Sequence, residues 1–161
     1  LCKVKLLKLI NVHDCGKLIN PQLAEAQVHG GMSMAIGYGM SEELKFDPKT
    51  GRPLNNIRLD YKLSIMMDHA HLEAHFVDYK LSTFMDHPTL QAAFVENPEP
   101  TSPYGTKALG EPPACSPAPA IRNAILNATG IGIDVAPITP HVLFAAFEKA
   151  GLFEKEETAH V

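Results

Sequence analysis

The residue best suited to acid–base chemistry is Glu111, which lies between Gly110 and two prolines within residues 105–113. A residue that precedes proline is disfavoured in helical backbone angles, so we expect Glu111 to be held rigidly in an extended conformation. Gly110 lets the chain turn tightly and leaves room for a ligand. A carboxylate held in this way and buried among apolar groups can act as a general base. Taken alone, a Glu before two prolines is more often a solvated turn residue.

A second group of candidates lies in residues 21–43, which are predicted to be helical because Asn20 can cap the helix and Pro21 suits its first position. Each glycine inside a helix costs about 1 kcal/mol relative to alanine, so several of them need a compensating contact. That contact is either tight packing of another segment or close approach of a ligand, and the sequence leaves both open. The interior glycines are Gly30, Gly31, Gly37 and Gly39.

The chain around these candidates contains short strand-like and loop-like segments. Residues 4–12 form a β-like run that starts without a turn or cap, which leads us to expect a preceding segment. A turn at residues 47–51 is expected to join short strands at residues 43–46 and 52–57. Residues 96–119 hold seven prolines and are expected to be a functional loop, because they are too long for a simple connection.

Two further helices are predicted near the end of the chain. One covers residues 118–129 and stops at Gly130, and the other covers residues 139–150. Together the elements predict an α+β fold, in which the helix at residues 21–43 packs on a small sheet that includes residues 4–12.

An internal duplication determines the expected domain organisation. Residues 60–77 and 78–95 are identical at twelve of eighteen positions. Two copies are too few for a solenoid, so one copy is expected to be an exposed insertion or a sequence error. We therefore expect residues 1–153 to form one part of a domain, followed by a charged tail at residues 154–161.

Composition and cysteine usage exclude several classes of protein. The chain of 161 residues carries a net charge of -4 without a basic cluster, which argues against binding to nucleic acid or to an anionic membrane. No run of residues is apolar enough for a membrane span, and we expect a cytoplasmic protein. Cys2, Cys15 and Cys115 are far apart and cannot form a disulfide framework, a zinc site or an iron–sulfur site. The nearby His69, His71 and His75 leave open a separate metal-binding module.

Five motifs in a fixed order resemble one known family. They are His-Asp-Cys-Gly at residues 13–16, Gln-Val-His-Gly-Gly at 27–31, Gly-Tyr-Gly at 37–39, Asp-Pro-Lys-Thr-Gly at 47–51 and Gly-Glu-Pro-Pro at 110–113. The set is similar to the terminal molybdopterin-binding domain of the xanthine dehydrogenase and aldehyde oxidase family, the molybdenum hydroxylases. The resemblance extends over residues 4–152.

The resemblance assigns roles to particular residues. Glu111 corresponds to the general base beside molybdenum, and Gln27 corresponds to a residue that hydrogen-bonds the metal–dithiolene unit or its pterin. The cofactor is also expected to contact Gly30, Gly31, Lys107 and Gly110. No protein side chain is expected to bind the metal directly, because molybdenum is held through the pterin dithiolene.

The resemblance also implies an activity and partners. The expected reaction is hydroxylation of an N-heteroaromatic compound (purine- or nicotinate-like) or of an aldehyde, with water as the oxygen source. Molybdopterin with molybdenum, as such or as the cytosine dinucleotide, is the expected cofactor. The remaining molybdopterin-binding polypeptide, an iron–sulfur subunit and an FAD subunit are the expected partners in a hetero-oligomer, without which the chain is not active. The alternative is a non-catalytic assembly subunit that supports a catalytic molybdopterin partner.

Overall fold

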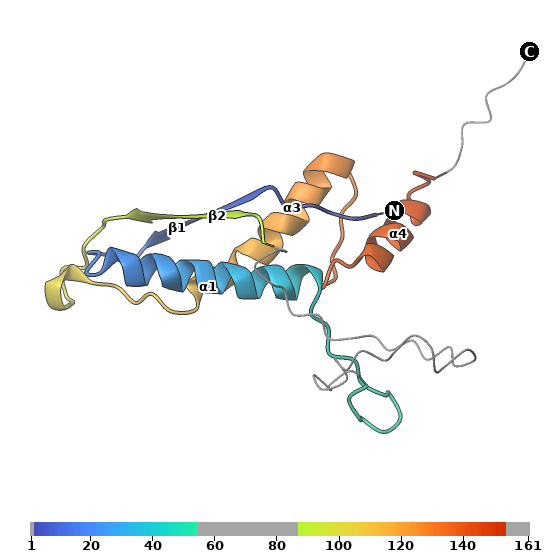
Figure 1. Cartoon of the computed structure of the whole chain (residues 1–161), viewed down its shortest axis with the longest axis horizontal. Helices are drawn as coiled ribbons and strands as arrows, with labels where there is room; N and C mark the ends of the chain where they lie inside the picture. The colour runs from blue at the N-terminus through green and yellow to red at the C-terminus, as the bar shows by residue number, and fades with distance from the viewer. Residues whose placement is uncertain (1, 55–86, 154–161) are drawn as a thin grey trace, which may run out of the picture.

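The computed structural model describes residues 2–54 and 87–153. The elements follow in the order β1 (Lys8–Asp14), α1 (Pro21–Met40), β2 (Thr89–Val95), the 3-10 helix η3 (Pro103–Gly105), α2 (Pro112–Cys115), α3 (Pro117–Thr129) and α4 (Pro140–Lys149) (Figure 1). The predicted α+β class is confirmed. None of the helices in these two ranges is long and apolar enough to cross a membrane.

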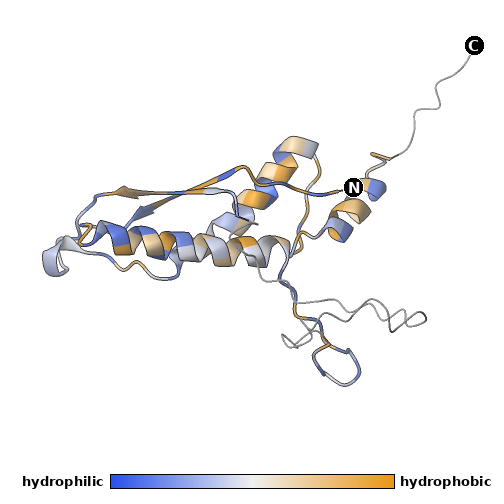
Figure 2. Ribbon diagram, viewed as in Figure 1, coloured by the Kyte–Doolittle hydropathy of each residue, from blue (hydrophilic) through white to orange (hydrophobic). Residues whose placement is uncertain are grey.

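Helix α1 begins where the sequence predicts. The Asn20 side chain accepts a hydrogen bond of 3.1 Å from the Leu23 N–H, and Pro21 takes the first helical position. The helix ends at Met40 rather than at residue 43, because Ser41 leaves the helical backbone angles (φ -141°, ψ -28°) and the Glu42 N–H donates to the Gly37 carbonyl at 2.8 Å. Hydrophobic and hydrophilic residues alternate along α1 without forming a single apolar stripe (Figure 2). A helix with this pattern is suited to contacts on more than one side.

The two strands pair in parallel, from Lys8 beside Thr89 to Asp14 beside Val95. They run along α1 (Figure 1), and α1 contacts β2. The connection between parallel strands must cross over, and α1 lies within this connection. The first strand is Lys8–Asp14, so the strand predicted at residues 4–12 starts four residues too early and ends two residues too early.

Strand β2 is the end of the second copy of the duplication. Of its four partly buried residues, Leu90, Ala92 and Phe94 are identical in the first copy, at positions 72, 74 and 76, whereas Ala93 is a histidine there. The second copy therefore supplies the strand that pairs with β1. Residues 55–86 lie outside the described residues, so the expected placement of the surplus copy stays a prediction.

The turn at residues 47–51 is present, but the strands predicted beside it are not confirmed. The Gly51 N–H donates to the Asp47 carbonyl at 2.8 Å, and the only bridge here joins Phe46 to Pro53 within the described part of this segment. Two backbone hydrogen bonds flank this bridge, from the Asp47 N–H to the Arg52 carbonyl at 2.8 Å and from the Leu54 N–H to the Lys45 carbonyl at 2.7 Å. The predicted strand over residues 43–46 is therefore reduced to one bridge residue, and the predicted strand over residues 52–57 cannot be scored beyond Leu54, because residues 55–57 lie outside the described range.

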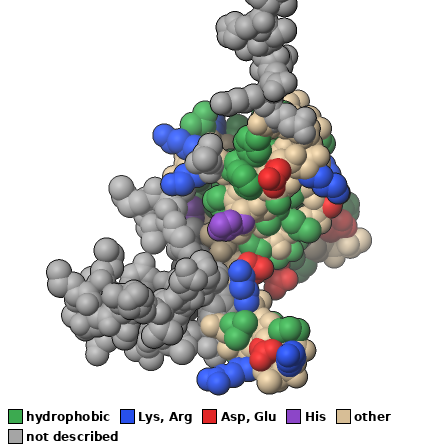
Figure 3. All heavy atoms as spheres, turned by 90° about the vertical axis from the view of Figure 1, so that its right-hand side faces the viewer, with side chains coloured by type: hydrophobic (Ala, Val, Ile, Leu, Met, Phe, Trp, Pro, Cys, Tyr) green, Lys and Arg blue, Asp and Glu red, His purple; other side chains and the backbone are tan. Residues whose placement is uncertain are grey.

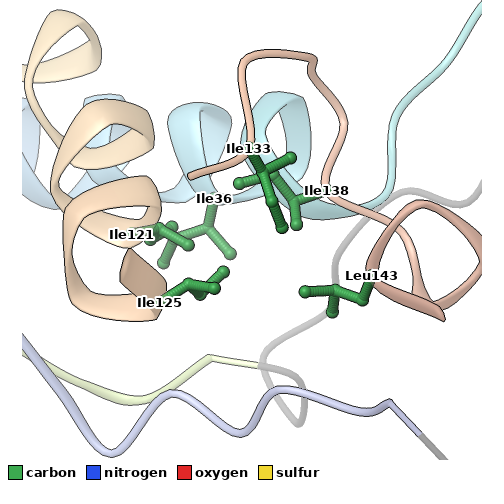
Figure 4. Close-up of a cluster of buried hydrophobic side chains, with 6 residues drawn as sticks. All are labelled: Ile36, Ile121, Ile125, Ile133, Ile138 and Leu143. Atoms are coloured by element: carbon green, nitrogen blue, oxygen red, sulfur yellow. The ribbon is translucent and has the colours of Figure 1, made fainter. Parts of the chain in front are cut away.

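The hydrophobic core lies where α1, α3 and α4 meet. Figure 4 shows its buried side chains pointing toward one another from α1, α3, the following connection and α4: Ile36, Ile121, Ile125, Ile133, Ile138 and Leu143. The predicted end of α3 is confirmed, since Gly130 adopts a left-handed φ of 74°. The predicted start of α4 is also confirmed, because the Thr139 side chain accepts a hydrogen bond from the Val142 N–H. This core fixes α3, which follows directly after α2 and the Glu111 segment.

Candidate functional site

The turn that ends β1 fastens the start of the loop that contains Glu111. The Lys107 N–H donates to the Cys15 carbonyl at 2.8 Å, and the Lys17 N–H donates to the Gly105 carbonyl at 2.9 Å. Gly16 has a φ of +68°, and a Cβ there would collide with the Gly105 carbonyl oxygen and lie 2.9 Å from the Lys107 nitrogen. Only glycine fits this crossing. The motif at residues 13–16 and the segment at residues 105–113 are thus joined through their backbones.

An ion pair adds to this junction. The Lys107 Nζ lies 2.6 Å from Asp14 Oδ2, and the Asn97 side chain donates to the same oxygen at 3.3 Å. The Gly16 N–H donates to Asp14 Oδ1 at 2.9 Å. The Lys107 hydrogen bond, followed by that from Gly16, lowers the pKa of Asp14 below its usual value. Lys107, expected to contact the cofactor, therefore places its ammonium group on Asp14.

Gln27 contacts the segment directly before Glu111. Its side-chain Nε2 donates a hydrogen bond of 2.7 Å to the Gly110 carbonyl oxygen, and Gln27 itself is exposed. The structure therefore brings together three residues predicted for the site: Gln27, Gly110 and Glu111. A primary amide retains a second N–H and an acceptor oxygen for another contact.

The two adjacent glycines of α1 face different surroundings. A Cβ at Gly31 would lie 2.6 Å from the Pro113 Cβ and 3.0 Å from the Pro113 carbonyl carbon. Gly31 thus allows α2 to pack closely on α1, which is the packing explanation left open by the sequence. A Cβ at Gly30 would meet no heavy atom within 4 Å, and Gly30 is exposed. Of the two, Gly30 is the glycine that leaves space for a ligand.

Glu111 precedes the one-turn helix α2 and is its N-cap residue. Its φ of -83° and ψ of -23° are helical, so the expectation of an extended backbone is wrong. The Ala114 N–H donates to the Glu111 carbonyl at 2.8 Å, and this turn compensates for the steric preference imposed by the following proline. Pro112 and Pro113 fix the next two φ angles. The Glu111 side chain is exposed rather than buried in this chain.

Asn11 is a residue of the site that the sequence analysis missed. It is the only buried polar or charged side chain among the described residues, with an exposed fraction of 6%. Its Nδ2 donates to the Pro113 carbonyl at 3.0 Å, and its Oδ1 accepts from the Ser116 hydroxyl at 3.1 Å. The signal was a lone amide within the apolar run of residues 9–12.

Metal ligands and thiols add no further site in residues 2–54 and 87–153. No group of three His, Cys, Asp or Glu residues there is arranged to hold a metal ion. The histidines at positions 69, 71 and 75 lie outside the described residues. Cys2, Cys15 and Cys115 are free. Burial lowers the pKa of His13, whose Nε2 has no hydrogen-bond partner in the described structure.

The chain is similar in sequence to known proteins. Residues 1–70 match the family model described as the molybdopterin cofactor-binding domain. A putative xanthine dehydrogenase molybdenum-binding subunit of Escherichia coli is 45% identical over 94% of this chain, which spans 18% of that protein. The aldehyde oxidoreductase molybdenum-binding subunit of the same species is 31% identical over 85% of this chain and 16% of its own length.

A solved structure shows the same fold. The crystal structure of quinoline 2-oxidoreductase from Pseudomonas putida 86 matches with a TM-score of 0.73 and 28% sequence identity. The match covers 90% of this chain and 16% of that one. The chain thus spans less than a fifth of the length of each of these three relatives.

Proposed function

The chain is homologous to part of the molybdenum-binding subunits of the xanthine dehydrogenase family, and on that premise we propose that it forms one side of the molybdopterin site of an oxidoreductase. Glu111 is the general base of this site. The observation that supports this role most is the contact between Gln27 and Gly110, which places the candidate cofactor ligand beside the candidate base.

The exposed face of α1 around Gln27 fits a bound pterin. Gly30 lies one helical turn after Gln27, and the space where its Cβ would be is open. A flat ligand can therefore approach the helix backbone closely at this point. Gln27 and Gly30 would contact the cofactor, together with Gly110 on the adjoining loop. Gly31 and Lys107 act behind this surface, through their contacts with Pro113 and Asp14.

When bound, the molybdenum centre supplies a Lewis acid and accepts two electrons from the substrate. The residues of this chain have simpler tasks. The Glu111 carboxylate accepts the proton that the attacking water-derived oxygen must lose. The two prolines after Glu111 and the hydrogen bond on Gly110 before it hold the carboxylate in position, which reduces the entropy cost of the reaction.

The substrate class is an N-heteroaromatic compound or an aldehyde, hydroxylated with oxygen from water. This part of the proposal is supported by the names of the relatives, which include xanthine dehydrogenase, aldehyde oxidoreductase and quinoline 2-oxidoreductase. Molybdopterin, as such or as its cytosine dinucleotide, is the cofactor.

Partner polypeptides complete the site. The face of α1 that includes Gln27 also exposes Leu23, Met34 and Tyr38, which are 68%, 69% and 61% exposed. Figure 3 shows further hydrophobic side chains at the surface of the end that carries α4, where Phe144 and Leu152 are among the exposed residues. Such surface is suited to burial against protein. We assign it to the remaining molybdopterin-binding polypeptide, within an assembly that includes iron–sulfur and FAD subunits.

In this assembly, residues 1–153 are one part of the molybdopterin-binding domain, with an 18-residue tandem duplication within residues 60–95 and residues 154–161 as a tail. Glu111→Gln in the complete enzyme, with molybdenum and pterin content measured alongside turnover, tests the proposal. Normal cofactor content with greatly reduced turnover would support it.

A further inference from the structure

Helix α2 cannot hold its own position. It contains four residues, Pro112–Cys115, and an isolated helix of that length is unstable in water. Because Glu111 is its N-cap residue, any movement of α2 changes where the Glu111 carboxylate lies. The contacts that fasten α2 to the rest of the fold therefore decide the position of the base.

The buried carbonyl group of Pro113 needs a hydrogen-bond donor from another part of the chain. In a continuous helix the donor would be the N–H of the residue four positions later, which is Pro117 and has none. Pro113 is fully buried, so its carbonyl oxygen has little access to water. The Nδ2 of Asn11 supplies the donor at 3.0 Å from the neighbouring strand β1.

The same side chain also holds the end of α2. The Oδ1 of Asn11 accepts a hydrogen bond of 3.1 Å from the hydroxyl of Ser116, the residue that follows the helix. A primary amide can make both contacts because it is donor and acceptor at once, whereas a carboxylate or an aliphatic side chain cannot. The Pro113 ring also packs on Gly31 of α1. Asn11 on β1 and Gly31 on α1 are thus both in contact with α2.

We propose that Asn11 is a positioning residue of the site, which fixes the direction of Glu111 by anchoring Pro113 and Ser116. The role of Asn11 in the reaction rests on the proposed function of Glu111. Its role in anchoring α2 does not, because that role follows from the hydrogen bonds alone. Asn11 contacts neither substrate nor cofactor, and it acts only through α2.

The test compares Asn11→Leu and Asn11→Asp with the parent in the complete enzyme, with Asn127→Leu as a control on the exposed face of α3. Both Asn11 variants remove the donor to Pro113. Hydrogen exchange at residues 110–116 is expected to become about 10-fold faster or more, since the Ala114 amide loses its protected turn. Exchange in α3 is expected to stay at the parent rate, which shows that the protein remains folded. Ser116→Ala removes only one of the two contacts of Asn11, so it should give a smaller increase in the exchange rate at residues 110–116. It replaces the Asn11 variants in the test if these do not fold.

Activity gives the second readout. At full molybdenum content, kcat is expected to fall about 10- to 100-fold with KM near the parent value, because a misplaced base is less effective whereas substrate binding does not use α2. Unchanged exchange at residues 110–116 in Asn11→Leu would overturn the anchoring role. Faster exchange with unchanged kcat, in an enzyme that Glu111→Gln inactivates, would overturn the positioning role. An active Glu111→Gln enzyme would refute the role of Glu111 as general base. The hydrogen-exchange result tests the anchoring of α2 by Asn11 separately, so the two failures can be told apart.

Discussion

The side-chain amide of Gln27 donates a hydrogen bond of 2.7 Å to the carbonyl oxygen of Gly110, the residue directly before Glu111. This contact joins α1 to a loop 83 residues further along the chain. A cofactor that contacts Gln27 would therefore act on the position of the catalytic loop through a single hydrogen bond.

The variant Gln27→Ala is expected to weaken retention of the cofactor. Removal of one hydrogen bond to a bound group costs about 1–3 kcal/mol, which corresponds to roughly a 5- to 150-fold loss of affinity. Molybdenum and pterin content of the complete enzyme after gel filtration measures the effect. Gln22→Ala, at an exposed position in the first turn of α1, is the control and should retain the parent content. Full retention in Gln27→Ala would remove this residue from the cofactor site.

The neighbouring glycines provide a matched pair of variants. Gly31→Ala places a methyl group 2.6 Å from the Pro113 Cβ, and overpacking of this kind costs about 1–3 kcal/mol of stability. Gly30→Ala meets no neighbouring atom and should stabilise α1 by up to about 1 kcal/mol, while lowering the cofactor content if the pterin lies there. Thermal unfolding separates the two. Equal destabilisation by both changes would contradict the different surroundings of the two glycines.

Local signals in the sequence predicted much of this fold. Asn20, Thr139 and Gly130 set helix boundaries through bonds to residues at most four positions away, and the structure confirms them. The pairing of β1 with β2 joins residues about 80 positions apart and could not be read from either segment alone. The backbone of Glu111 was predicted wrongly because the rule for residues before proline ignores the hydrogen bond from Ala114.

The candidate site likewise contains residues that the sequence predicted and contacts that it did not. Gln27, Gly110 and Glu111 were found through their motifs, and the structure brings them together. The ion pair between Lys107 and Asp14 could not be predicted, since Asp14 lies 93 residues earlier in the chain. Asn11 was overlooked because its burial depends on the position of α2, which only the folded chain reveals.

The ion pair between Asp14 and Lys107 predicts a pH dependence. The pKa of Asp14 is lowered in the folded protein, mainly by the Lys107 hydrogen bond. The ionised carboxylate therefore stabilises the fold above its unfolded pKa of about 3.9, and this contribution is lost as pH falls through the lower folded pKa. Asp14→Asn should lower the free energy of unfolding at about pH 7 and leave it less dependent on pH below about pH 4. Denaturant titrations across this range measure both effects.

The exposed pair between Arg122 and Asp134 supplies the control for this experiment. Their side chains lie 2.6 Å apart, away from the Glu111 loop, and Asp134 is 83% exposed. Asp134→Asn is expected to change stability by less than about 1 kcal/mol. If Asp14→Asn gave the same loss of stability at about pH 2 as at about pH 7, the carboxylate would not be the source of the effect.

The duplication predicts that one copy is dispensable. Since Thr89–Val95 of the second copy forms β2, deletion of residues 60–77 leaves the strand pairing with β1 intact. Shortening a connection changes the closure entropy only slightly, by about 0.6 kcal/mol for each halving of its length. The thermal unfolding temperature of the deletion variant should therefore remain near that of the parent. Failure of the variant to fold would show that the first copy belongs to the core.

Glu111→Gln tests the central claim most directly. Glutamine keeps the shape of the side chain but cannot accept the proton, so turnover in the complete enzyme is expected to fall by about 10²- to 10⁴-fold or more. Assembly, molybdenum content and pterin content should match the parent enzyme, because none of the contacts described for the loop involves the Glu111 carboxylate. Parent-level turnover by a Glu111→Gln enzyme with full cofactor content would contradict the account, and would identify this chain as a structural support for a catalytic partner.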